Sequence, residues 1–135
     1  VSEKEVREYI FRKSSDAYCY GWILREFVKI ENFVTELLHI RQGLADILDD
    51  LHDYENDLEQ DQPNILLLHF LSGNYFPRNN KEAINYSRKQ GINLEISSHA
   101  ESLVSRAQSL GVSRYPILDK AIMSKFHKIN KVLRL

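Results

Sequence analysis

One apolar stripe constrains the fold of this chain more than any other feature. Between residues 32 and 59, apolar side chains recur every three or four positions, as one face of an α-helix requires: Leu37, Ile40, Leu44, Ile47, Leu48, Leu51, Tyr54 and Leu58. No proline interrupts this stretch. The pattern predicts a long helix from Asn32 to about Glu59 that buries one face.

The helical period continues through the rest of the chain, and no segment shows the alternation of a strand. Ser2 and Glu5 have the spacing of a capping box, which predicts a helix start. Later helices are predicted over 65–71, from about 81 to 110 with or without a break at Gly91, and from Ser113 onward. We therefore predict an all-α fold, an antiparallel helical bundle, as a single domain over 1–135.

Composition excludes several classes of protein. The chain has 135 residues and a net charge of −1, so it has no basic field that would attract nucleic acid. The longest apolar run, 65–68, is far short of the ~20 residues that span a membrane. We find no secretory signal pattern, and the single cysteine, Cys19, fits a reducing compartment. These features predict a cytoplasmic protein with Cys19 as a small buried side chain.

The long predicted helix also carries a cluster of five acids: Asp46, Asp49, Asp50, Asp53 and Asp57. At roughly 100° per residue, four of them fall within about 80° of one another, and Asp49 lies just beside them. This acidic face lies about a third of a turn from the apolar stripe, which predicts a position at the rim of the core. Like charges at this spacing repel by about 0.2–0.5 kcal/mol per pair, so they need water or bound cations. Carboxylates are ligands that Mg²⁺ prefers.

A second interpretation of the acids, a face that is simply solvated, stays open. Two other metal-site patterns are not supported by the sequence. The five histidines form no HxxxH or HExxH pattern, and His52 lies opposite the aspartates. The segment from Asp49 to Asp61 lacks the central glycine and the final glutamate of a calcium-binding loop.

The acids also form a motif. Residues 49–57 follow the pattern DDxxDxxxD, Lys13-Ser14 lies 36 positions before Asp49, and helices are predicted after the motif. This order resembles the C-terminal half of the class I isoprenoid synthases, in particular the all-trans prenyl diphosphate synthases. Residues 46–50 are also similar to the second motif of squalene and phytoene synthases. The resemblance covers most of this chain and about half of such an enzyme.

The resemblance implies a magnesium-dependent prenyltransferase that ionises an allylic prenyl diphosphate for chain elongation. Mg²⁺, or Mn²⁺ in its place, would be held by Asp49, Asp50, Asp53 and Asp57, with Asp46 as a further ligand. Lys13 and Ser14 would bind the diphosphate. Isopentenyl diphosphate would be the second substrate, and a homodimer is expected. Aromatic side chains are expected to shield the carbocation: Tyr18, Tyr20, Trp22, Phe27 and Phe33.

The chain departs from the family pattern at several positions. Asp46 stands where prenyl synthases usually have glutamine, and Ser14 replaces the threonine of a Lys-Thr pair. Asp61-Gln62 replaces a Gly-Lys pair, and a first aspartate-rich motif would lie before Val1. Two alternatives therefore stay open. One is a terpene cyclase or an enzyme of the squalene and phytoene synthase type, and the other is a non-catalytic helical-bundle relative or partner subunit.

Overall fold

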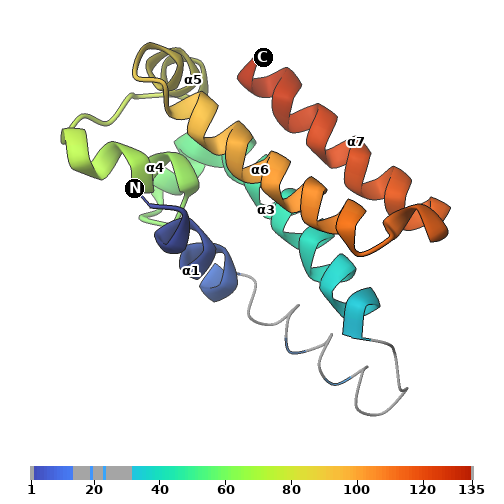
Figure 1. Cartoon of the computed structure of the whole chain (residues 1–135). Helices are drawn as coiled ribbons and strands as arrows, with labels where there is room; N and C mark the ends of the chain where they lie inside the picture. The colour runs from blue at the N-terminus through green and yellow to red at the C-terminus, as the bar shows by residue number, and fades with distance from the viewer. Residues whose placement is uncertain (1, 14–18, 20–22, 24–31, 135) are drawn as a thin grey trace.

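The computed structural model describes residues 2–13, 19, 23 and 32–134, and the regular elements in this part of the chain are all helical (Figure 1). The α-helices are α1 (Glu3–Lys13), α3 (Asn32–Glu59), α4 (Ile65–Phe70), α5 (Asn80–Lys89), α6 (Ile92–Ser109) and α7 (Pro116–Leu133). Short 3₁₀ turns lie at Leu71–Gly73 and Val112–Arg114. The all-α prediction is confirmed.

Helix α3 is the centre of the bundle, because α1, α4, α5, α6 and α7 all pack against it. Figure 1 shows α6 running antiparallel to both α3 and α7, its neighbours along most of its length. The predicted stripe faces this core: Leu37, Leu44 and Tyr54 are fully buried. An antiparallel helical bundle was the predicted architecture, and it is confirmed.

The ends of the first helices follow from local chemistry. At the start of α1, the Ser2 N–H donates to Glu5 Oε2 at 2.7 Å, and the Glu5 N–H donates to Ser2 Oγ at 3.2 Å. This is the capping box that the sequence predicts. Helix α3 also has the bounds predicted for it, Asn32–Glu59, and it contains the whole apolar stripe.

Three expectations need correction or completion. The region from 81 to 110 is two helices, because Gly91 adopts φ 74°, a left-handed conformation that ends α5. The last helix begins at Pro116, not Ser113, since proline fits the first helical position and keeps Tyr115 out of the helical region. Cys19 is exposed, not buried as predicted.

A cluster of aromatic rings fixes the last turns of α3, where Tyr54 lies between Asp53 and Asp57. Tyr54 is fully buried and donates its hydroxyl to the Pro77 carbonyl at 2.8 Å, which ties α3 to the loop before α5. The Tyr54 ring lies edge-on to Phe70, and Phe70 lies edge-on to Tyr86. Burial raises the pKa of Tyr54 to about 12, so its hydroxyl stays a donor.

Within the described residues, no helix combines the length and the apolar character that crossing a bilayer requires.

Two glycine substitutions test this description. Gly91→Ala should lower the free energy of unfolding by about 1–2 kcal/mol, because alanine is strained at positive φ although the space around it is open. Gly43→Ala is the matched control. Its added Cβ would lie at ordinary contact distances from Leu103 (3.5 Å) and Ile10 (3.7 Å) inside a helix, so stability should rise by about 0.5–1 kcal/mol. Urea unfolding followed by circular dichroism measures the stability of both variants. Equal effects of the same sign would contradict the left-handed conformation of Gly91.

Candidate functional site

The five acids divide between the interior and the surface of the bundle. Asp46 and Asp50 are 7% and 1% exposed, whereas Asp57 is half-buried. Asp49 and Asp53 are exposed to solvent and lie one helical turn apart. The acidic face therefore lies at the rim of the core, as predicted.

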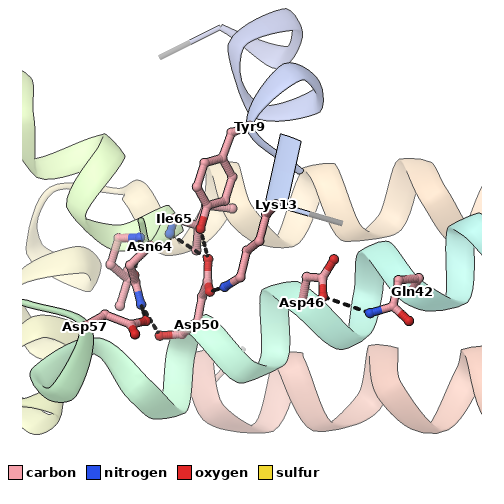
Figure 2. A network of polar contacts seen from close by, with 9 residues as sticks. Tyr9, Lys13, Gln42, Asp46, Asp50, Asp57, Asn64 and Ile65 are labelled. Atoms are coloured by element: carbon pink, nitrogen blue, oxygen red, sulfur yellow. Dashed lines mark hydrogen bonds and ion pairs between the residues drawn. The ribbon is translucent and has the colours of Figure 1, made fainter. Parts of the chain in front are cut away.

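Asp50 is the centre of a polar network that joins three helices (Figure 2). Its Oδ2 accepts the Tyr9 hydroxyl of α1 at 2.6 Å and the Ile65 backbone N–H at the start of α4 at 2.7 Å. Its Oδ1 forms an ion pair with Lys13 Nζ, and the Lys13 side chain is 29% exposed. A buried carboxylate is tolerated only with such partners, because desolvation of an unpaired charge is very costly.

Asn64 connects the same network to Asp57. Its side chain caps α4 by accepting the Leu66 N–H at 2.8 Å. Its Nδ2 donates to the Asp50 backbone carbonyl at 2.7 Å and to Asp57 Oδ2 at 2.9 Å. Asn64 thus orients Asp57 while it fixes the turn between α3 and α4.

Asp46 lies one turn before Asp50 and is only partly satisfied. Its Oδ1 accepts Gln42 Nε2 at 2.9 Å, whereas the buried Oδ2 has no hydrogen-bond partner within the described residues. Burial raises the pKa of Asp46, against the lowering effects of the Gln42 hydrogen bond and the Lys13 charge, and Asp49 raises it further. The charges of Lys13 and Asp49 therefore both act on this carboxyl group.

Tyr9 lies beside the acids as a neutral donor. Burial raises the pKa of its hydroxyl above the ordinary value, and the charges of Asp57 and Asp46 raise it further. The hydroxyl therefore keeps its proton and donates a hydrogen bond to Asp50.

An apolar groove of about 480 Å³ adjoins this network and shares Tyr9 and Asn64 with it. The rest of its wall is mainly apolar: Leu58, Pro63, Leu67, Leu68, Leu71 and Phe76. Leu71 is 62% exposed and Phe76 is 37% exposed, so apolar surface continues from the groove to the outside. A polar network beside an apolar groove suits a ligand with one charged and one apolar end.

The structure brings some of the predicted site residues together and leaves others apart. Lys13 and Asp50, which are 37 positions apart in sequence, are in direct contact. No hydrogen bond or ion pair joins Asp49 or Asp53 to another side chain of the described residues. The predicted diphosphate ligand Ser14 lies outside the described residues, as do Tyr18, Tyr20, Trp22 and Phe27.

Phe33, the remaining predicted aromatic, lies near the start of α3. The Arg114 guanidinium carbon is 5.2 Å from the centre of its ring, and the Tyr115 ring centre is 6.0 Å away. The cation that this ring meets here is therefore a side chain of the protein.

Tyr9, Gln42 and Asn64 belong to the network, although no sequence motif points to them. Tyr9 precedes Lys13 by one helical turn, so the two residues lie on one face of α1. Asn64 directly precedes an apolar helix and has the chemistry of an N-cap, but its bonds to Asp50 and Asp57 depend on how the chain turns back on α3.

The carboxylates of the acidic face meet some of the requirements of a magnesium ion and not others. Within the described residues, no group of three or more histidine, cysteine, aspartate and glutamate side chains could hold a metal ion by itself. Mg²⁺ commonly uses one or two carboxylates, with waters and substrate phosphate oxygens completing its shell. Asp49 and Asp53 supply two exposed carboxylates on neighbouring turns, which fits that smaller requirement.

Comparisons of the chain with protein-family models, curated proteins and solved structures give no match. The class that the fold and site define is thus an all-α bundle with an acidic, partly buried face beside an apolar groove.

The partly satisfied carboxyl of Asp46 predicts a pH effect on stability. Because the pKa of Asp46 is raised in the folded protein, the folded state holds this proton more tightly than the unfolded chain. Ionisation therefore costs stability as the pH rises through the folded pKa. Asp46→Asn removes this cost and can keep the bond from Gln42, so it should be more stable than the parent protein at pH 7. The difference should shrink as the pH falls through the raised folded pKa toward the ordinary aspartate pKa, and it should change no further below that value.

Urea unfolding at a series of pH values measures this difference. Asp53→Asn, on the exposed part of the same helix, is the control and should follow the parent protein within about 0.5 kcal/mol. If the difference in unfolding free energy between Asp46→Asn and the parent protein stays constant with pH, folding does not raise the pKa of Asp46.

Proposed function

We propose that this chain forms part of a magnesium-dependent prenyltransferase of the isoprenoid synthase type, which ionises an allylic prenyl diphosphate for chain elongation. One observation carries the proposal: Lys13 and the acidic motif meet through Asp50. The family resemblance assigns both to the binding of one diphosphate. Sequence order alone does not require residues 37 positions apart to touch.

The roles of the residues follow from the chemistry of ionisation. Negative charge grows on the diphosphate as its bond to the allylic carbon breaks, so cationic groups fixed beside it lower the barrier. Asp49 and Asp53 would hold Mg²⁺, with Asp46, Asp50 and Asp57 supporting or adding to them, and the ion would supply positive charge to the leaving group. Lys13 would bind a diphosphate oxygen as a point charge, and Ser14 would add a hydroxyl donor.

The apolar groove supports the same substrate class. Its volume of about 480 Å³ lies within the ~300–1,000 Å³ that is usual for ligand pockets. Leu67, Leu68 and Phe76 offer hydrocarbon and aromatic surface to an isoprenoid chain, and such a wall also keeps water away. Tyr9 and Asn64 lie where the groove meets the acidic network.

A second candidate is a non-catalytic helical-bundle relative or partner subunit. A specific observation favours it: Asp50 and Asp57 are both held in bonds that stabilise the junction of α1, α3 and α4. Asp61-Gln62, in place of the family's Gly-Lys, also removes a cation expected at the diphosphate. A terpene cyclase or an enzyme of the squalene and phytoene synthase type would share the ionisation step, so its products would distinguish it.

The proposal also includes partners and location. Isopentenyl diphosphate is the proposed second substrate, and Mn²⁺ is the proposed substitute for Mg²⁺. A homodimer in the cytoplasm completes the proposal.

Turnover by the full-length protein tests the function. Dimethylallyl, geranyl and farnesyl diphosphates are supplied with Mg²⁺, with and without isopentenyl diphosphate, and the products are identified. Asp49→Ala and Asp53→Ala should each lower kcat by about 10²–10³-fold or more, because each removes a metal ligand. Both residues are exposed, so helical content should not change.

Glu59→Ala is the matched control, since it removes an exposed acid from the same helix outside the acidic face. It should keep the parent rate. Rates equal to the parent in both aspartate variants would contradict the catalytic assignment, and absence of turnover in the parent protein would favour the non-catalytic candidate.

A further inference from the structure

His69, on α4, is a buried titratable side chain that takes no part in the network around Asp50. Its side chain is 4% exposed, and its Nδ1 lies 3.2 Å from Oε2 of Glu95 on α6, whose side chain is 60% exposed. A carboxylate can only accept, so this contact favours a proton on Nδ1 of the neutral ring. Nε2 is then the nitrogen that takes up a second proton when the pH falls.

Two cavities adjoin this pair, and both are lined by His69 and Glu95. One has a volume of about 450 Å³ and is also lined by His99 of α6 and by the apolar side chain of Val6 from α1. The other has a volume of about 210 Å³ and is also lined by Tyr86 of α5. Among the described residues that line these two cavities, Glu95 is the one carboxylate, so it is the counter-charge that a protonated His69 would meet.

The surroundings of His69 oppose its protonation. Burial lowers the pKa of His69, the charge of Glu95 raises it, and the amino-terminal charge lowers it, with the net result below the ordinary value of 6.5. Glu95 offsets only part of the cost of burial, because it is largely exposed and water screens its charge. A conformation in which the ring of His69 reaches water would therefore take up the proton more readily than the packed one.

Helix α4 connects His69 to the candidate site. At the start of this helix, the Ile65 N–H donates to Asp50 Oδ2 at 2.7 Å, and Leu67 and Leu68 line the apolar groove. Ile65 lies one helical turn before His69, and both residues line the larger cavity. Because α4 has only six residues, a displacement at His69 would alter both the bond to Asp50 and the wall of the groove.

We propose that His69 and Glu95 form a pH-sensitive contact between α4 and α6, in which protonation of His69 loosens α4 and thereby weakens the Ile65–Asp50 bond and alters the wall of the groove. This inference is independent of the proposed function, because it requires neither a metal ion nor a diphosphate. Its sign follows from the lowered pKa: the packing of α4 loses stability as the pH falls below 6.5, and the loss is complete below the lowered pKa.

Amide hydrogen exchange of the full-length protein, followed by NMR and divided by the intrinsic rate at each pH, tests the loosening. Between about pH 7.5 and pH 5, the protection of the Ile65 and Leu68 amides should fall about threefold or more. Both amides donate hydrogen bonds at the start of α4. The amide of Ile129, a fully buried residue of α7, should change less than about twofold.

Two histidine variants assign the effect to one residue. His69→Gln removes the titratable ring and keeps a donor for Glu95, so the protection of α4 should stay constant over this pH range. His52→Gln removes an exposed histidine of α3 and, as the matched control, should follow the parent protein. The same fall in protection in His69→Gln as in the parent would overturn the proposal, because another group, such as His99, would then be responsible.

The NMR signal of the His69 ring gives a second readout that leaves the histidine in place. Its titration midpoint should lie below 6.5 in the parent protein. Glu95→Gln, at an exposed position, should move the midpoint to lower pH, because it removes the charge that favours the protonated ring. A parent midpoint at or above 6.5, or a midpoint that Glu95→Gln leaves unchanged or raises, would overturn the proposal.

Discussion

The buried carboxylate of Asp50 is the interaction on which the junction of three helices depends. An ionised group that is 1% exposed requires compensation, and Tyr9, Lys13 and the Ile65 N–H provide it from α1 and α4. Each partner fixes an element: Tyr9 and Lys13 hold α1 against α3, and the N–H of Ile65 sets where α4 begins. A charge in the core thereby specifies how the chain turns back on its longest helix.

The acidic face has two parts with different physical tasks. Asp50 and Asp57 are held by partners inside the protein, and Asp46 is buried with one oxygen unpaired. Asp49 and Asp53 face solvent on the same helix. A motif that reads as one cluster in the sequence therefore combines structural carboxylates with exposed ones, and the proposed metal chemistry needs the exposed pair most.

Much of the fold could be predicted from the sequence because its signals are local. The stripe of α3 and the capping box of α1 predict those elements correctly, since both depend on residues within one or two helical turns. The break at Gly91 stayed open because a glycine inside a helical pattern costs only about 1 kcal/mol, too little to decide. The start of α7 was placed too early because Ser113 is a good N-cap, but Pro116 outweighs it.

The candidate site was predictable in part. Lys13 and the aspartates were grouped as candidate site residues from their order in the sequence, and the structure brings Lys13 into contact with Asp50. The roles of Tyr9 and Asn64 could not be predicted, because their contacts join segments 41 and 14 positions from Asp50 and depend on tertiary packing. Which of the acids are buried and which are exposed also depends on tertiary packing.

A double-mutant cycle between Lys13 and Asp50 tests the central contact most directly. Unfolding free energies are measured for Lys13→Met, Asp50→Asn and the double variant, with Asp49→Asn replacing Asp50→Asn in a parallel control cycle. We expect a coupling of about 1–3 kcal/mol for Lys13 with Asp50 and less than about 0.3 kcal/mol for Lys13 with Asp49. Additive effects of Lys13→Met and Asp50→Asn would contradict the account, because they would mean that the lysine and the buried carboxylate do not meet.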